Sequence, residues 1–123
     1  MAKFFSMLSW PLVLSRLLAA FFLLGSAINI IAPGSTAADY QRWGYPAWFH
    51  FVTGAMELAA CVLLIAAPAR LFGAALGSAV MLGAITTLLV HGEYAHAGLP
   101  AGILALLMLV GWVALLAWAT VPA

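Results

Sequence analysis

Four long apolar stretches occupy most of this chain, and they constrain its fold more than any other feature. They run over about residues 11–31, 47–67, 71–91 and 99–120. A helix needs about 20 mostly apolar residues to cross a hydrocarbon core roughly 30 Å thick. Each stretch is therefore predicted to form a membrane-spanning helix.

The composition excludes a soluble domain. Of 123 residues, 67% are apolar and 6% are charged, whereas soluble domains have roughly 45–50% apolar and about 25% charged residues. This small number of charges cannot cover a surface that faces water. We therefore expect the protein to lie in a lipid bilayer. The net charge of +1 provides no basic patch for nucleic acid, and a single cysteine excludes a disulfide framework.

Prolines and glycines separate the apolar stretches. Breakers occur at Pro33-Gly34, Tyr45-Pro46, Pro68 and Gly98-Leu99-Pro100. The turn at Pro68 is so short that the second and third helices are expected to form an antiparallel hairpin. Because backbone amides in lipid need internal partners, helices are the structure expected at this length. We predict one all-α domain over 1–123, an antiparallel bundle of four transmembrane helices.

The few charges indicate an orientation. Lys3, Arg16 and Arg70 lie on one side of the predicted bundle, and Arg42 lies on the other. The positive-inside rule then places both termini in the cytoplasm, in a membrane of the bacterial inner type. As an alternative, the first stretch could be a signal peptide cleaved near Ser35. Because it is too long and its cleavage site is poor, we keep it as a span.

Two charged residues lie within the predicted spans, Arg16 in the first and Glu57 in the middle of the second. A charge at the bilayer centre costs at least ~2.5–3.5 kcal/mol on insertion scales. The two side chains are therefore expected to meet as a buried ion pair. This pair has either a structural role, holding two helices together, or a functional one, in which the carboxyl exchanges a proton.

Further polar and small residues predict a site around this pair. His50, Gly54 and Glu57 share one face of the second span, because they follow helical spacing. Asn29 and His91 lie near the outer ends of their own spans. The candidate ligand-binding site consists of Arg16, Asn29, His50, Gly54, Glu57 and His91.

The histidines have a second interpretation, and metal binding is not predicted. His50 and His91 each lie within a turn of a span end, where an imidazole can meet water at low cost. The segment 91–96 holds three potential ligands, but their spacing matches no metal motif. No catalytic residue is predicted either, because the chain has no nucleophile–base pair or phosphate loop.

Small residues at Ala69, Gly73 and Gly77 recur every four positions at the start of the third span. Such a ridge lets two helices approach closely. The partner helix lies either in the same bundle or in a second protomer, and the pattern does not choose between them.

The chain resembles the DoxX-like family of small four-helix membrane proteins. The resemblance rests on the sequences at 44–48 (GYPAW), 53–58 (TGAMEL) and 80–84 (VMLGA), with Arg16 and Gly25 in the first span. It covers nearly the whole chain, and its motifs are moderately specific. One departure is Ile28, where many relatives carry a lysine.

The resemblance implies little about activity: some members belong to a membrane-associated redox complex, and most have no assigned activity. Some members are similar to the membrane subunit of a thiosulfate–quinone oxidoreductase, although the family supplies no catalytic role for the matching positions. The motif residues that carry over are Arg16, Gly25, Gly54 and Glu57.

Three functions are compatible with these features. The first is an accessory membrane subunit of a redox system, with quinone as the expected ligand and an oxidoreductase as the partner. The second is a small proton-coupled transporter that works as a homo-oligomer. The third is a membrane scaffold without a ligand. An enzyme acting on its own is not expected.

Overall fold

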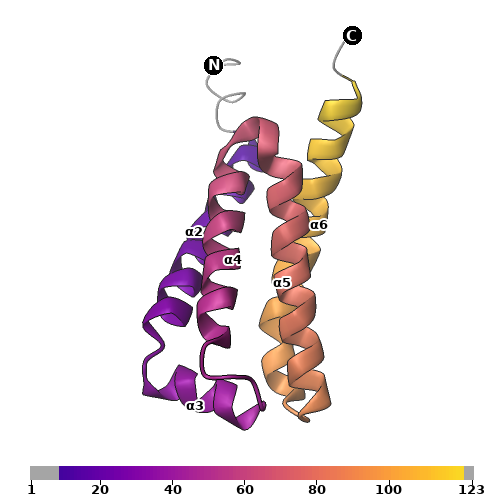
Figure 1. The fold of residues 1–123 in the computed structure, drawn as a ribbon. Helices are drawn as coiled ribbons and strands as arrows, with labels where there is room; N and C mark the ends of the chain where they lie inside the picture. The colour runs from indigo at the N-terminus through magenta and orange to yellow at the C-terminus, as the bar shows by residue number, and fades with distance from the viewer. Residues whose placement is uncertain (1–8, 121–123) are drawn as a thin grey trace.

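The protein is described here from a computed structural model, in which residues 9–120 are placed. These residues form helices and turns, with no strand between 9 and 120, which confirms the all-α prediction. Four long helices lie side by side, and their chain direction alternates (Figure 1). They are α2 (Trp10–Ile31), α4 (Phe49–Ile65), α5 (Arg70–Val90) and α6 (Gly98–Ala119).

Three shorter helices connect them. The helix α3 (Gly34–Arg42) joins α2 to α4, η1 (Ala67–Ala69) joins α4 to α5, and η2 (Tyr94–Ala97) joins α5 to α6. Both α3 and η2 lie at the same end of the bundle, opposite to the start of α2 and the end of α6 (Figure 1). The helix α3 replaces what the sequence predicts as a loop between the first two spans.

Local sequence explains where the long helices end. Pro11 lies in the first turn of α2. A proline is tolerated there because the N–H groups of the first turn have no acceptor within the helix. Ala32 ends that helix in a left-handed conformation, with its N–H bonded to Ile28 O. Pro68 separates α4 from α5, and the Arg70 guanidinium donates to the carbonyl of Leu64 at the end of α4. The predicted hairpin around Pro68 is present.

The helix lengths agree with membrane spans in three cases. The helical segments Trp10–Ile31, Ala67–Val90 and Tyr94–Ala119 are long and apolar enough to cross a bilayer. In place of the predicted span 47–67, α4 has 17 residues, or roughly 25 Å of helix, against a core of roughly 30 Å. It is short because residues 47 and 48 belong to a turn after Pro46.

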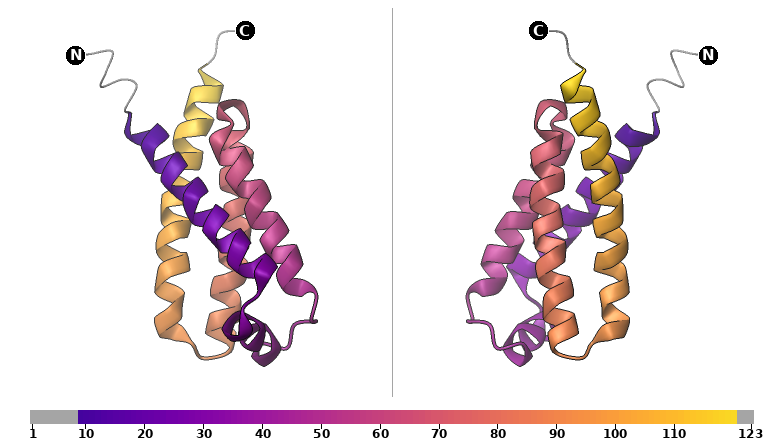
Figure 2. Two further views of the ribbon diagram at one scale, coloured as in Figure 1. Left: turned by 90° about the vertical axis from the view of Figure 1, so that its left-hand side faces the viewer. Right: turned by 90° about the vertical axis from the view of Figure 1, so that its right-hand side faces the viewer.

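The core runs through the middle of the bundle and takes residues from all four long helices. Phe22 of α2, Leu64 of α4 and Leu107 of α6 are fully buried, and α5 contributes Ala74, Val80 and Met81. The outer faces carry large apolar side chains such as Leu24, Val90 and Trp118. An apolar exterior around an apolar core is the arrangement that a lipid solvent favours. Figure 2 shows how α2 crosses the bundle obliquely.

The ridge of small residues packs inside the bundle. A Cβ at Gly73 would lie 2.7 Å from Leu64 N of α4, and one at Gly77 would lie 2.9 Å from the ring of Phe22. The two glycines therefore bring α5 against α4 and α2 of the same chain. This observation decides between the two partners that the sequence leaves open.

Candidate functional site

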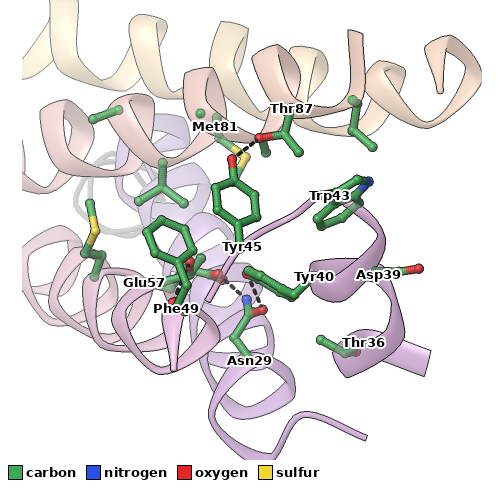
Figure 3. Close-up of a pocket in the computed structure, with 17 residues that line it drawn as sticks. Asn29, Thr36, Asp39, Tyr40, Trp43, Tyr45, Phe49, Glu57, Met81 and Thr87 are labelled. Carbon is green, nitrogen blue, oxygen red and sulfur yellow. Dashed lines mark hydrogen bonds between the residues drawn. The ribbon is translucent and has the colours of Figure 1, made fainter. Parts of the chain in front are cut away.

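The carboxyl group of Glu57 is the centre of the site. Glu57 is 5% exposed, and its Oε1 accepts a hydrogen bond from Asn29 Nδ2 (Figure 3). On the α2 side the carboxyl lies against Gly25, where a Cβ would come within 1.9 Å of Oε2. A glycine at this position is what allows the carboxyl to rest on the backbone of α2.

Asn29 connects Glu57 to a residue that the sequence does not indicate. Its Nδ2 also donates to Gly25 O at 3.1 Å, and its Oδ1 accepts a hydrogen bond from Tyr40 Oη at 2.8 Å. Tyr40 belongs to α3 and is buried. Burial raises the pKa of the Tyr40 phenol, so it remains a hydroxyl donor at neutral pH. The result is a hydrogen-bonded chain from Tyr40 through Asn29 to Glu57.

The predicted ion pair between Arg16 and Glu57 is wrong. Arg16 is exposed, and the ion pairs found within residues 9–120 join Arg42 to Asp39, Arg42 to Glu93 and His96 to Glu93. The reason is axial position: Glu57 meets α2 at Gly25, nine residues beyond Arg16, or roughly 13 Å along the helix. An amide instead of a guanidinium therefore binds the carboxyl.

The other three predicted site residues are His50, Gly54 and His91, and the structure places each of them differently with respect to the site. His50 packs beside the site, with its Nδ1 2.7 Å from Asn29 O. Gly54 is buried, and a Cβ there would lie 2.7 Å from Ile30 Cγ1 and 3.2 Å from Ser26 O, so it admits a neighbouring helix and leaves no opening for a ligand. His91 is not part of the site, because it is exposed and its Nδ1 bonds to Thr87 O within its own helix end.

A cavity of about 340 Å³ lies next to this hydrogen-bonded chain. Its polar end holds Asn29, Tyr40 and Glu57. The rest of its wall is mostly apolar and aromatic and comes from α3, α4, α5 and the segment between α3 and α4, as Figure 3 shows. The further lining residues include Trp43, Tyr45, Phe49, Met56, Val80, Met81, Ala84, Thr87 and Leu88.

Tyr45 spans the cavity between α4 and α5. Its ring stacks on Phe49 with centroids 4.5 Å apart and planes 7° from parallel. Its hydroxyl forms a hydrogen bond with Thr87 Oγ1 of α5. The short length of α4 places Tyr45 here, because the chain turns at residues 46–48 before the helix begins. One wall of the cavity is therefore a pair of stacked rings.

A polar contact joins the two connecting segments at this end of the bundle. Trp43 Nε1 donates to Glu93 Oε2 at 2.6 Å, and the Arg42 guanidinium donates to Glu93 Oε1 at 2.7 Å. Arg42 also pairs with Asp39 at 2.8 Å. Because Trp43 and Asp39 line the cavity, this contact ties α3 to the segment before η2 and holds one side of the cavity in place.

This contact is expected to depend on pH. Glu93 accepts hydrogen bonds from Trp43 and Arg42, and these lower its pKa below the ordinary value of 4.5. The hydrogen bond from Trp43 has the larger effect. A lowered carboxyl pKa stabilises the folded contact above the unfolded pKa, and this stabilisation is lost as the pH falls through the folded value. We expect the Trp43 indole N–H resonance to move as the pH falls below about 4.5.

The control for this experiment is Glu93→Gln, which keeps a hydrogen-bond acceptor for Trp43 but cannot titrate. In this variant the Trp43 resonance should not change over the same pH range. An identical shift in the variant would assign the pH response to another group and would contradict the role given to Glu93.

The residues that the sequence analysis did not place in the site share one property. Tyr40, Trp43 and Tyr45 lie between the apolar stretches, in a region predicted as a loop. One signal for α3 was present: Asp39 and Arg42 have the i, i+3 spacing of a helical pair, and a proline precedes the segment. Nothing in that pattern indicates that Tyr40 reaches Asn29.

Comparison with known proteins gives one result. The DoxX-like family matches the chain over residues 13–120. Neither the curated proteins nor the solved structures give a significant match. The match includes α4, α5 and α6, all of α2 after its first three residues, and every residue of the Tyr40–Asn29–Glu57 chain. With three helices long and apolar enough to cross a membrane, this chain is an integral membrane protein and belongs to the DoxX-like family.

Proposed function

We propose that this protein is an accessory membrane subunit of a redox system in an inner (plasma) membrane of bacterial type, and that its cavity binds a quinone headgroup. The observation that carries the proposal is the Tyr40–Asn29–Glu57 chain at one end of a cavity whose remaining wall is apolar and aromatic. Small-molecule sites combine a mostly apolar lining with a few convergent polar groups.

The wall of the cavity fits a flat, largely apolar ring. The stacked Tyr45 and Phe49 rings form one side, and Val80 and Met81 of α5 form part of another. Aromatic pairs prefer offset-stacked or edge-to-face contact, and a methionine adapts to irregular shapes. At about 340 Å³, the cavity is at the lower end of ligand-pocket volumes, which run from ≈300 to 1,000 Å³. A headgroup would fit, with its tail outside.

Electron transfer in such a system belongs to the quinone and to a partner. The chain has one cysteine, Cys61, so it cannot supply the four thiolate ligands of an ordinary iron–sulfur cluster. When bound, a quinone would supply two-electron redox chemistry. This chain would hold the ring, exclude water from it and place polar groups at one of its edges. An oxidoreductase partner in the same membrane is therefore part of the proposal.

Partly filling the cavity tests this proposal. Gly83 lines the cavity, and a Cβ added there meets nothing within 4 Å. In lipid nanodiscs, Gly83→Leu should weaken binding of 1,4-naphthoquinone roughly tenfold, because the added side chain occupies space that the ligand needs. The unfolding midpoint should change little.

The matched control is Gly102→Leu, which adds the same side chain to α6 where the surroundings are also open and no cavity residue is present. It should bind naphthoquinone like the unmodified protein. Absence of naphthoquinone binding by the unmodified protein, together with absence of quinone in the complex extracted from native membranes, would overturn the proposal and favour a scaffold.

A second candidate, a proton-coupled transporter acting as a homo-oligomer, is favoured by one observation. Within residues 9–120 no cation pairs with Glu57, so its protonation is not tied to a fixed charge. Glu57→Gln in proteoliposomes should then abolish proton-coupled flux of the substrate. The control is Gly102→Ala on α6, outside the cavity lining, where an added Cβ meets nothing within 4 Å. Unchanged flux in the Glu57 variant would exclude the transporter.

A further inference from the structure

At the polar end of the cavity, the N–H groups of Asn29 and the O–H group of Tyr40 are already bonded to other groups of the protein. Asn29 has two N–H donors, and these bond to Gly25 O and Glu57 Oε1. Tyr40 has one O–H donor, and it bonds to Asn29 Oδ1. With the Glu57 carboxyl ionised, the chain from Tyr40 to Glu57 therefore contains no donor that remains available to a ligand.

The same end keeps acceptors. A phenol oxygen has lone pairs besides its O–H, and a carboxylate has about four lone-pair sites. Tyr40 and Glu57 both line the cavity, and the hydrogen bonds described above use one lone-pair site of the Glu57 carboxyl. A ligand that reaches this end meets oxygen atoms that can accept.

Donors elsewhere in the wall are engaged in part, and the Thr36 hydroxyl of α3 is one that makes no hydrogen bond within residues 9–120. Trp43 Nε1 donates to Glu93, and Thr53 Oγ1 lies 3.4 Å from Phe49 O. In the hydrogen-bonded hydroxyl pair of Tyr45 and Thr87, one O–H is used and one is left. This pair lies toward α5 (Figure 3), so the α2 side of the cavity is rich in acceptors.

From this distribution we infer that the cavity selects a ligand that carries a hydroxyl donor on its ring, a phenol in chemical class. The inference rests on the proposed function and deepens it: of a quinone and its reduced form, the quinol binds more tightly. A phenolic O–H can donate to Glu57 or Tyr40. A quinone carbonyl at the same place puts an acceptor against acceptors, and no hydrogen bond forms.

The expected preference is large enough to measure. A hydrogen bond to a charged group in a buried site changes affinity by about tenfold or more, and an acceptor left unpaired lowers affinity further. The preference should depend on Glu57, because a glutamine at this position offers an N–H donor as well as an acceptor. The Glu57→Gln site could then receive a carbonyl as well as a hydroxyl.

The test compares three ligands of nearly the same shape. Binding of 1-naphthol, 1-methoxynaphthalene and 1,4-naphthoquinone is measured on the full chain in nanodiscs, with empty nanodiscs to subtract partition into lipid. We expect 1-naphthol to bind at least tenfold more tightly than either of the others. In Glu57→Gln the ratio between naphthol and naphthoquinone should fall toward one, while the methoxy compound remains weak.

The outcomes separate the two proposals. If naphthoquinone binds as tightly as naphthol, or more tightly, the cavity still holds a quinone, but the selection for a donor is overturned. If the naphthol preference is unchanged in Glu57→Gln, the carboxyl does not set it, and the inference is also overturned. If none of the three ligands binds, the proposed function fails together with the inference. The comparison of the three ligands on the unmodified chain can overturn the inference by itself. The test therefore does not depend on whether the Glu57→Gln variant folds.

Discussion

Replacing Gly25 by alanine should displace the Glu57 carboxyl and weaken binding of 1-naphthol roughly ten- to hundredfold. A Cβ at this position would lie 1.9 Å from Glu57 Oε2 and 3.1 Å from its Cδ, so the carboxyl group must move. Moving it breaks the hydrogen bond with Asn29. The naphthol hydroxyl then loses its acceptor, and a hydrogen bond to a charged group contributes about 1.5–3 kcal/mol, which corresponds to that range of affinity.

The fold should survive this change. The atoms that the new Cβ meets are the far end of a flexible side chain, not backbone, so the helices need not separate. Gly102→Ala is the control, because nothing lies within 4 Å of its added Cβ, and it should leave binding unchanged. If Gly25→Ala binds 1-naphthol like the unmodified chain, the Glu57–Asn29 pair does not form the polar end of the site.

Replacing Gly73 by alanine is expected to have the largest effect on stability. Here a Cβ would lie 2.7 Å from Leu64 N and 2.9 Å from the carbonyl carbon of Leu63. Backbone atoms cannot rotate away as a side chain can, so α5 and the end of α4 must move apart. Overpacking of this kind costs about 1–3 kcal/mol. Reversible unfolding in mixed detergent micelles, followed by helical circular dichroism, would measure the loss.

A graded series of alanine substitutions provides the comparison. At Gly111 the new Cβ would lie 3.2 Å from Ala74 Cβ, and at Gly102 it meets nothing within 4 Å. Stability should therefore fall in the order Gly102→Ala, Gly111→Ala and Gly73→Ala. A Gly73 variant as stable as the Gly102 variant would mean that α4 and α5 are not packed as closely as described.

Much of the fold follows from local patterns. Each apolar stretch gives a helix whose observed ends lie within one residue of the prediction, apart from α4 (Phe49–Ile65), which is two residues shorter at each end than the predicted span 47–67. Part of the buried face of α4 was also predicted, because Gly54 and Glu57 share one face by helical spacing and both are buried. These features depend on the periodicity of one segment at a time.

The site was predicted in part. Asn29, His50 and Glu57 do come together, since a buried carboxyl needs polar partners and few polar residues lie within the apolar stretches. Arg16 and His91 do not join them. The error on Arg16 lies in the axial offset of α2 against α4: Glu57 meets α2 at Gly25, although it stands in the middle of α4 as it does in the predicted span.

The amino-acid sequence by itself determined the solvent, the helical class and the buried carboxyl, because each depends on composition or on spacing along one helix. Only the tertiary structure decided which group binds Glu57 and what encloses the cavity. The axial offset of α2 against α4 is set where Gly25 and Gly54 let the two helices touch, and a one-dimensional pattern carries no information on that offset. The same packing brings Tyr40 of α3 onto Asn29, which turns a single carboxyl into a site.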